Sequence, residues 1–382
     1  MSAGKVVLHR FSGSDYELGM QQGQMLRDQI RALLQDIRTL DAVKAMKPRL
    51  MPASVFLAMA KRRAGKLLGE SIFRYYPRQG RRVRGIAEGA GVDLSSVLFL
   101  QSLELLIGRP SFRIQACTSL GFSAEKTSTN EVIVAKNFDY LNVAAPYSLT
   151  RETRVEGGYG TLGCAMPPLA GMLDGMNEHG LTVTYNLAYT MDRPRNYAPL
   201  SLALQEMLET CKRTDEAVRY ITEAKRGGHD ALLMIGDAEG DVKAVEISAN
   251  HYAVREMTGG QIINTNHYLT EEMRQFEIPH DAVHFGRGVS PQLMRTRVHE
   301  SSERRRERAE ELLKDRSLVN EADVAGVLRD HGEDNAPSRN TICRHDPISS
   351  TLRSMIFFPE RRTMKVLYGN TCQGQYEEFT FS

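Results

Sequence analysis

The sequence predicts an α+β protein built from layers of helices and sheets. Residues 1 to about 110 carry apolar side chains at helical spacing. From Cys117 onward, short segments rich in Val, Ile, Thr, Tyr and Phe are separated by turn signals, and two pairs of helical segments interrupt them. Runs of hairpin strands that alternate with paired helices favour α+β layers over a regularly alternating parallel sheet.

The first third of the chain is expected to be helical. Ser14 and Glu17 have the spacing of a capping box, which predicts that a helix begins there. Apolar residues then recur at helical spacing at Leu26, Ile30, Leu33, Leu34 and Ile37. Further helices are expected over residues 55–68, from about 81 through the GIAEGAG segment, and from Asp93 through 106.

The rest of the chain predicts hairpins and four more helices. Strand-like segments are CTSLGFS, EVIVAKNF, LTVTYNLAY, ALLMIGD, DVKAVEIS, HYAVREM, SMIFFPE and TMKVLYG. The first two are expected to pair as a hairpin, as are ALLMIG with VKAVEIS and the last two with each other. Helices are predicted over about 198–212, 214–226, 291–314 and 319–330.

Composition excludes several classes of protein. Apolar residues make up 41% and charged residues 25% of the 382 positions, as in ordinary globular proteins. Lys and Arg number 49 against 47 Asp and Glu, so no nucleic-acid partner is expected. The Arg-rich segment 301–316 interleaves acids with its arginines, which indicates a solvated helix face. No apolar run suits a membrane span or a signal peptide, so we predict a cytoplasmic protein with no membrane partner.

The cysteines and histidines give no metal or disulfide pattern. The cysteines are Cys117, Cys164, Cys211, Cys343 and Cys372, widely spaced and without a CxxC pair, which argues against a disulfide framework and a Cys-rich zinc site. His280 and His284 have the spacing of a helical metal site, but the flanking Pro279 and FGRG segment oppose a helix there. The glycines of 85–93 and 157–163 do not match a phosphate loop, so we interpret them as turns. We therefore predict no metal and no cofactor.

Cys117 differs from the other cysteines because it stands where the helical segment gives way to strands. If the chain were cut before it, its α-amino group, with a reference pKa of about 7.7–8.0, could take the thiol proton. The sequence therefore predicts a helical prosegment over 1–116 and a catalytic body over 117–382. The other four cysteines are interpreted as packing residues.

Several motifs, taken in order, resemble a known family. They are Tyr16-Glu-Leu-Gly19-x-x-x-Gly23, Gly85-Ile-Ala-Glu-Gly89-Ala-Gly91, Cys117-Thr-Ser, Asn137-Phe-Asp139-Tyr140, Asp174-Gly-Met-Asn177-Glu-His-Gly180-Leu, Asn186, Thr265-Asn266-His267 and Thr341-Ile-Cys343-Arg344-His345. Together they resemble the acyl-coenzyme A:6-aminopenicillanic acid acyltransferase group of N-terminal nucleophile hydrolases, with choloylglycine hydrolases as more distant relatives. The resemblance implies a four-layer αββα sandwich.

The resemblance also implies roles for individual residues. Cys117 would be the nucleophile of both self-cleavage and catalysis, and Asp139 would hold the new amino group. Asn186 would donate to the tetrahedral oxyanion. Asn266 would stabilise the oxyanion or orient the nucleophile. The structural alternatives are a strand-end turn for the segment around Asp139, and asparagines that only satisfy backbone groups.

Two further residues and two departures complete the resemblance. Tyr140 would contact the substrate. Arg344 would bind a substrate carboxylate or organise the site, with a surface ion pair as the alternative. Ala116 stands before Cys117 where the penicillin acyltransferase pattern has Gly, so self-cleavage is expected to be slow. Lys136 replaces the Arg of choloylglycine hydrolases, so bile-salt specificity is not implied.

We therefore expect an enzyme that breaks or makes an amide bond through an acyl-thioester on Cys117. Hydrolysis of a small N-acyl amide is the main hypothesis, and acyl transfer to an amine, with acyl-CoA as one donor, is the alternative. A second alternative is an unprocessed, dormant or binding protein, in which the nitrogen of Cys117 remains an amide. A cysteine-protease mechanism needs a histidine near Cys117, and no histidine has a convincing spacing. The prosegment is expected to stay bound after cleavage, and nothing in the sequence indicates an oligomeric state.

Overall fold

The computed structural model describes residues 4–39, 47–48, 50–107, 116–192, 198–225, 230–286 and 289–382. Before Cys117 the elements are β1 (Leu8–Gly13), α1 (Asp15–Met25), α2 (Arg27–Thr39), α4 (Ala53–Tyr75), α5 (Pro77–Ala90) and α6 (Leu94–Ile107). They are followed by β2 (Thr118–Phe122), η2 (Ala124–Lys126), β3 (Ile133–Leu141), η3 (Asn142–Tyr147), β4 (Leu149–Val155), β5 (Thr161–Ala165), β6 (Asp174–Asn177) and β7 (Thr182–Leu187). Next come α7 (Leu200–Thr210), α8 (Thr214–Glu223), β8 (Ala231–Gly236), β9 (Val242–Ile247), β10 (Tyr252–Arg255) and β11 (Gln261–Asn264). The last are α9 (Glu271–Arg274), α10 (Glu300–Leu313), α11 (Glu321–Leu328), β12 (Ser349–Phe358), β13 (Thr363–Tyr368), η4 (Thr371–Gln373) and β14 (Glu377–Thr380).

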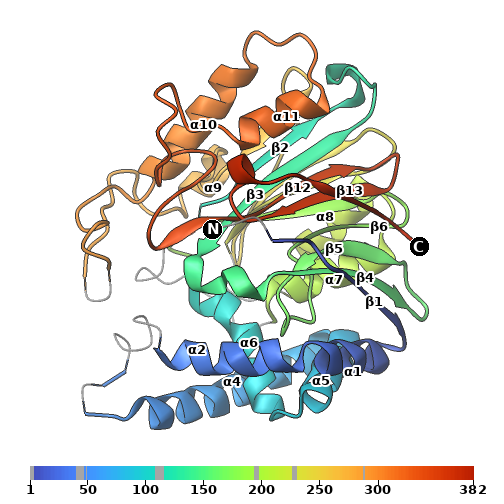
Figure 1. Cartoon of the computed structure of the whole chain (residues 1–382), viewed down its shortest axis with the longest axis vertical. Helices are drawn as coiled ribbons and strands as arrows, with labels where there is room; N and C mark the ends of the chain where they lie inside the picture. The colour runs from blue at the N-terminus through green and yellow to red at the C-terminus, as the bar shows by residue number, and fades with distance from the viewer. Residues whose placement is uncertain are drawn as a thin grey trace.

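The described strands form two sheets that face each other (Figure 1). The larger sheet has the order β1-β4-β5-β6-β7-β8-β9-β10, and the smaller has the order β11-β2-β3-β12-β13-β14. Helices α7 and α8 cover the outer face of the larger sheet, and α10 and α11 cover the outer face of the smaller one. This order of layers confirms the predicted αββα arrangement.

The strands of the smaller sheet show why the layers form. In β3, Ile133 and Ala135 belong to a core shared with α10 and α11, whereas Val134 belongs to the core between the sheets. In β12, Ile356 and Phe357 divide in the same way. Successive side chains of a strand point to opposite faces, so an apolar run within a strand packs into two cores at once.

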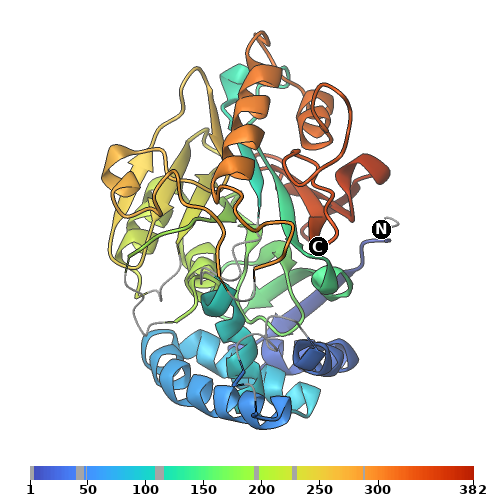
Figure 2. The same cartoon turned by 90° about the vertical axis from the view of Figure 1, so that its left-hand side faces the viewer.

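The sequence predicts a helical segment before Cys117. The structure contains a strand there as well as helices. Strand β1 pairs in parallel with β4 and forms one edge of the larger sheet. Helices α1, α2, α4, α5 and α6 gather at one end of the molecule, below the layered body, in both views (Figures 1 and 2). The prosegment predicted over 1–116 therefore shares a sheet with the rest of the chain.

Glycines bring α1 and α5 into close contact, and this corrects the interpretation of the glycines of 85–93 as turns. Gly85 and Gly89 lie within α5, and a Cβ at Gly85 would meet the carbonyl oxygen of Tyr16 at 2.2 Å. A Cβ at Gly19 would meet the carbonyl oxygen of Arg82 at 2.0 Å. Because these glycines have no side chain, the backbones of α1 and α5 can lie against each other. Among them, only Gly91, at the helix end, has a left-handed φ of +61°.

The second glycine segment, residues 157–163, was also interpreted as a turn, and its second half departs from that interpretation. Residues Thr161–Ala165 form β5, so the second half of the GGYGTLG segment is a strand and not a turn.

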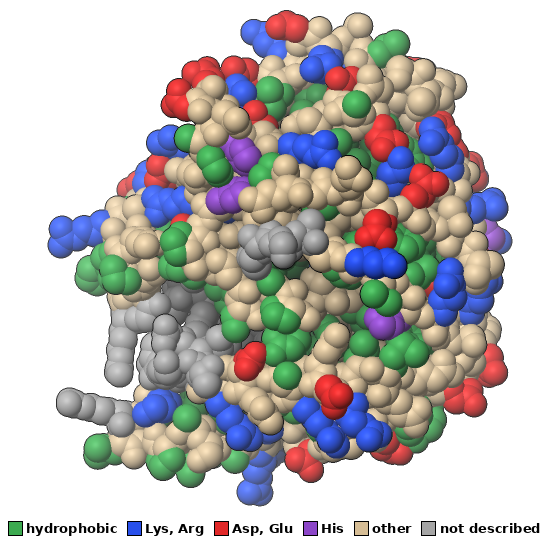
Figure 3. All heavy atoms as spheres, viewed as in Figure 1, with side chains coloured by type: hydrophobic (Ala, Val, Ile, Leu, Met, Phe, Trp, Pro, Cys, Tyr) green, Lys and Arg blue, Asp and Glu red, His purple; other side chains and the backbone are tan. Residues whose placement is uncertain are grey.

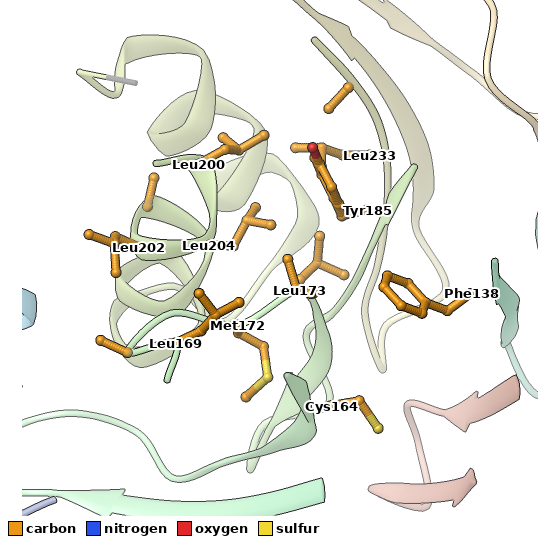
Figure 4. Packing of buried hydrophobic residues seen from close by; sticks show 14 of the residues in the cluster. Phe138, Cys164, Leu169, Met172, Leu173, Tyr185, Leu200, Leu202, Leu204 and Leu233 are labelled. Carbon is orange, nitrogen blue, oxygen red and sulfur yellow. The ribbon is translucent and has the colours of Figure 1, made fainter. Parts of the chain in front are cut away.

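Figure 4 shows leucines of α7 packed beside Tyr185 and Leu233 of the larger sheet, with Phe138 of the smaller sheet on the other side. No helix among the described residues is long and apolar enough to cross a bilayer.

Candidate active site

Cys117 lies at the junction between the helical end of the molecule and the first strand of the smaller sheet. The residue directly precedes β2, and 3% of its surface is exposed. Its backbone N–H donates a 2.8 Å hydrogen bond to Oδ1 of Asn266. Its Sγ lies 4.0 Å from the carbonyl oxygen of Asp139. The structure thus brings together three of the predicted catalytic residues, which come from three different strands or strand ends.

Arg305, which was not predicted from the sequence, completes this group. Its guanidinium donates to the carbonyl oxygen of Cys117 (2.5 Å), to Oγ1 of Thr118 (2.9 Å) and to Oδ1 of Asn266 (2.8 Å). The side chain is 1% exposed although it belongs to α10, part of the segment interpreted as a solvated face. A planar guanidinium with several fixed donors suits such a site better than a point charge does.

A periodicity in the sequence could have revealed Arg305. The buried residues of α10 are Ser302, Arg305, Ala309 and Leu313, which stand at helical spacing on one face. Three of them are small or apolar, so Arg305 is the charged residue on the face that turns inward. The interpretation of 301–316 as solvated holds for its exposed positions and is wrong for this one.

Only one of the two carboxylate oxygens of Asp139 has a hydrogen-bond partner among the described residues. Its Oδ1 accepts a 2.7 Å hydrogen bond from Oγ1 of Thr351, whereas its Oδ2 is buried and has no hydrogen-bond partner among the described residues. Burial raises the pKa of Asp139 to about 6, although the nearby cations Arg305 and Arg344 act against this rise. Asp139 lies within β3, so the alternative of a strand-end turn is wrong.

Asn266 uses both ends of its amide. Its Nδ2 donates to the carbonyl oxygen of Leu187 (2.6 Å), which fixes the orientation of the group, and its Oδ1 accepts from Cys117 and Arg305. Its backbone N–H donates to Oγ of Ser302 at 2.7 Å. Of the two roles predicted for Asn266, the geometry favours orientation of the nucleophile, because the oxygen and not the N–H group faces Cys117.

Asn186 lies next to this group but faces other partners. It is the penultimate residue of β7 and is fully buried. Its Oδ1 accepts from Oγ of Ser119, and its Nδ2 donates to the carbonyl oxygens of Asn264 (3.1 Å) and Thr265 (2.9 Å). The side chain therefore links β2, β7 and the end of β11 in this state of the chain.

Arg344 and Tyr140 occupy different environments. Arg344 is 3% exposed, so the alternative of a surface ion pair is wrong. Its guanidinium donates to Oγ of Ser349 (2.9 Å) and to the carbonyl oxygen of Arg339 (2.8 Å). Tyr140 is half-buried near the end of β3, where its ring stacks on Phe138 with 5.4 Å between the ring centres.

The thiol of Cys117 is neutral in this state. Burial raises its pKa, and the charge of Lys136 acts against that rise. The ammonium of Lys136 is fully buried and pairs with Oδ1 of Asp174 at 2.5 Å. Among the described residues, the polar partners of Cys117 are Asn266, Asp139 and Arg305, so none is a histidine.

A small cavity borders this group of residues. Its volume is about 30 Å³, and its walls include Ala116, Asn266, Arg305 and Arg344. The segment between α9 and α10 supplies much of the opposite wall, which is lined by residues His284, Leu293, Thr296, Arg297 and Val298. A volume of this size holds one or two water molecules.

The remaining cysteines test the prediction that they are packing residues. Cys164, Cys211 and Cys343 are buried, as expected, and Figure 4 shows Cys164 in the core. Cys372 is exposed, so for this residue the prediction is wrong.

Solved structures that resemble this chain do so at low sequence identity. A Caenorhabditis elegans N-acylethanolamine-hydrolyzing acid amidase ortholog is 16% identical, with a TM-score of 0.42 over 64% of this chain and 93% of that chain. A conjugated bile acid hydrolase variant from Clostridium perfringens is 14% identical, with a TM-score of 0.43 over 70% and 97%. Penicillin V acylase from Agrobacterium tumefaciens is 16% identical, with a TM-score of 0.38 over 65% and 82%. At TM-scores below 0.5, none of these likenesses identifies a substrate.

A family match over more than half of the chain identifies the class of enzyme. The sequence profile described as acyl-coenzyme A:6-aminopenicillanic acid acyl-transferase matches residues 126–373. The match begins after Cys117, so it identifies the family without testing the nucleophile. The predicted enzyme class, an amide hydrolase or N-acyltransferase of the N-terminal nucleophile type, is the class of this family. The chain belongs to the acyl-coenzyme A:6-aminopenicillanic acid acyl-transferase family.

Proposed function

We propose that the protein is a self-cleaving N-terminal cysteine amidohydrolase that acts on a small N-acyl amide. The observation that carries this proposal is the setting of the nitrogen of Cys117. This nitrogen donates to Oδ1 of Asn266, and nearby Asp139 carries a buried Oδ2 that lacks a partner among the described residues. An ammonium has three N–H groups where an amide has one. The unsatisfied oxygen suits a group that appears only after cleavage.

Self-cleavage would begin with an acyl shift at the bond between Ala116 and Cys117. Sγ attacks the carbonyl carbon of Ala116, the C–N bond breaks, and the nitrogen of Cys117 takes the thiol proton and becomes an amine. Water then hydrolyses the Ala116 thioester, which releases a carboxylate at Ala116 and a free thiol. The small cavity beside Ala116 has room for one or two waters, as this step requires.

In the mature enzyme, the new amine would act as the general base for the thiol. Burial raises the thiol pKa, so the site needs a base, and the α-amine has a suitable reference pKa. The thiolate attacks the substrate carbonyl, an acyl-thioester forms, and the protonated amine gives its proton to the leaving amine. Asp139 and Asn266 would hold the amine, and Arg305 would fix Cys117 and Asn266 in position.

The roles of the other predicted residues follow from their positions. Asn186 would serve the oxyanion if one N–H of its amide left the carbonyl of Asn264 or Thr265. Arg344 lines the cavity and would face the substrate. Tyr140 follows Asp139 in β3 and would also contact the substrate.

The segment 1–116 would remain bound after cleavage as a small subunit, as the contacts across the cut support. Strand β1 is an edge strand of the larger sheet, and Arg82 forms a buried ion pair with Glu209 at 2.9 Å. Nε2 of Gln22 donates to the carbonyl oxygens of Pro167 (2.7 Å) and Leu169 (3.0 Å). We also propose that the enzyme works in the cytoplasm, since free cysteines suit a reducing compartment.

Acyl transfer is the second candidate, and the name of the matched family favours it. The chemistry differs only in whether water or an amine resolves the acyl-enzyme, with acyl-CoA as one donor. A dormant protein is the remaining alternative, in which the bond before Cys117 stays intact and the nitrogen cannot act as a base.

Trapping of the acyl-enzyme tests the proposal. The cleaved protein is mixed with a panel of N-acyl amides and acyl-CoA thioesters, quenched in acid and analysed by peptide mass spectrometry. The proposal expects an acyl group on the peptide that begins with Cys117. Added amine changes the product only if the enzyme is a transferase. Turnover without any acyl group on Cys117, and turnover that persists in the Cys117→Ala variant, would contradict the proposal.

A further inference from the structure

Four potential metal ligands, none of which the proposed mechanism uses, meet beside the smaller sheet. They are His331, Cys343, His345 and Cys372, and one ligand atom from each lies within 4.8 Å of all the others. His331 follows α11, Cys343 and His345 precede β12, and Cys372 lies in η4. In Figure 3, histidine side chains gather on the face where Figure 1 draws the short helix η4.

The distances within this cluster approach those of a tetrahedral metal site. Nε2 of His345 lies 3.5 Å from Sγ of Cys343 and 3.3 Å from Sγ of Cys372. Zinc–sulfur and zinc–nitrogen bonds of about 2.3 Å and 2.0 Å place such ligands about 3.6 Å apart around a tetrahedral ion. The widest separation is below 4.8 Å, so closure on a metal needs a movement of about an ångström.

The orientation of His331 is a second and independent observation. Its Nε2 is buried and has no hydrogen-bond partner among the described residues. Its Nδ1 lies 3.2 Å from Oδ1 of Asn335. An amide oxygen accepts, so this contact places the proton on Nδ1 and the lone pair on Nε2. Metal-bound histidines commonly donate their second N–H to an oxygen in this way.

We propose that His331, Cys343, His345 and Cys372 bind one Zn²⁺ ion as a structural Cys₂His₂ site. Two thiolates and two imidazoles in tetrahedral array favour zinc over hard cations. On binding, each thiol releases its proton to solvent, and no electron transfer is involved. The widely spaced cysteines gave no sign of such a site in the sequence, because the fold and not a CxxC pair brings the ligands together.

The site would hold the wall of the active-site cavity in place. Its two neighbouring ligands, Cys343 and His345, flank Arg344, which lines that cavity. The carbonyl oxygen of Arg344 accepts from Nδ2 of Asn370 at 3.1 Å, and Asn370 lies two residues before the fourth ligand. A metal that joins these segments would fix the backbone of Arg344, whether or not the chain cleaves itself.

Metal analysis of the full chain, purified without a histidine tag under reducing conditions, tests this proposal. We expect about one zinc per chain. After chelation, Co²⁺ should restore one metal per chain and give the thiolate-to-cobalt absorption of a tetrahedral site. Wild-type protein that takes up neither metal would overturn the proposal. An intact mass lower by two hydrogens, with Cys343 and Cys372 joined in a disulfide, would also overturn it.

Matched variants separate this site from adventitious binding. Cys372→Ser removes a ligand at an exposed position, so the fold should persist by circular dichroism. Loss of an outer-shell partner weakens metal binding about 10- to 100-fold, so loss of a ligand should weaken it more than about 100-fold. His331→Ala should behave similarly, and Cys211→Ser, outside the cluster, should bind like wild type. Unchanged cobalt spectra in both ligand variants would contradict the proposal.

Discussion

The backbone N–H of Cys117 donates a 2.8 Å hydrogen bond to Oδ1 of Asn266, although the two residues lie 149 positions apart in the chain. The same Oδ1 accepts from the guanidinium of Arg305. The amide end of Asn266 is fixed on the carbonyl of Leu187, so the acceptor cannot turn away without the loss of that bond. The nitrogen that would become the catalytic base is therefore already held in place before any cleavage.

The Cβ of Ala116 is expected to slow self-cleavage. The bond before Cys117 must distort for Sγ to approach the carbonyl carbon, and Ala116 is 2% exposed, so its methyl group has little room. Ala116→Gly should increase the first-order rate of cleavage, measured by the appearance of the two fragments on a denaturing gel. An equal or lower rate in the glycine variant would show that this methyl group does not limit the reaction.

Cleavage and turnover should depend on the ionisation of Asp139. Its pKa is about 6, so the carboxylate becomes protonated as the pH falls through that value and can no longer pair with an ammonium. Rates should fall below pH 6, and Asp139→Asn should lower them roughly 100-fold and remove this pH dependence. If the rates of Asp139→Asn still fell below pH 6 as in wild type, the pH dependence would belong to another group.

The same residue should destabilise the folded chain at neutral pH. The folded-state pKa of about 6 exceeds the ordinary value of 3.8, so the folded chain binds the proton more tightly than the unfolded chain. Above pH 6, ionisation in the folded state then costs about 3 kcal/mol. In a Cys117→Ala background, Asp139→Asn should raise the free energy of unfolding at pH 8 by up to this amount. Below pH 4 the gain should vanish.

Urea unfolding at both pH values measures this difference. Asp281→Asn is the control because Asp281 is exposed, and its effect should stay within about 0.5 kcal/mol. If Asp139→Asn destabilised the chain at pH 8, the carboxylate would be stabilising and its burial would not dominate.

Arg305 should be needed for its shape as well as its charge. Arg305→Lys retains the charge but cannot reach the Cys117 carbonyl, Thr118 and Asn266 together. We expect the rate of cleavage to fall roughly 100-fold. Arg304→Ala is the control on the same helix, since Arg304 is exposed and pairs only with Glu300 among the described residues. Comparable cleavage rates for Arg305→Lys and wild type would show that the guanidinium of Arg305 is not needed for the reaction.

The crossing of α1 and α5 should tolerate no side chain at its glycines. A Cβ at Gly85 would lie 2.2 Å from a backbone oxygen, so Gly85→Ala must push the helices apart and should destabilise the chain by at least about 2 kcal/mol. Gly326 in α11 has nothing within 4 Å of its Cβ position, and Gly326→Ala should stabilise the chain by about 0.5–1 kcal/mol. Melting temperatures of the two variants should therefore move in opposite directions.

Most of the fold was predictable because its signals are local. The capping box at Ser14 and Glu17 forms as expected, and so does the hairpin of β2 and β3. Strand β1 was missed because its pairing partner, β4, lies about 140 residues away and its own sequence has no clear alternation. The helix predicted from 291 begins only at Glu300, since turns, bends and an isolated β-bridge occupy residues 291–299.

The site was predictable only in part, for a related reason. Cys117, Asp139 and Asn266 were found through motifs that resemble a family, whereas Arg305 reaches the site from a helix with a misleading composition. The zinc ligands we propose come from three segments whose spacing carries no pattern. Their convergence depends on the pairing of β12 with β3 and on the position of η4, which no local signal encodes.

Intact mass of the purified chain over time is the most direct measurement. If Cys117 is a self-cleaving nucleophile, the wild-type chain should give fragments of 116 and 266 residues that elute together until they are denatured. Cys117→Ala should stay at full length and lack amidase activity. A wild-type chain that remains a single 382-residue species yet hydrolyses amides, and does so equally after Cys117→Ala, would contradict the proposed mechanism.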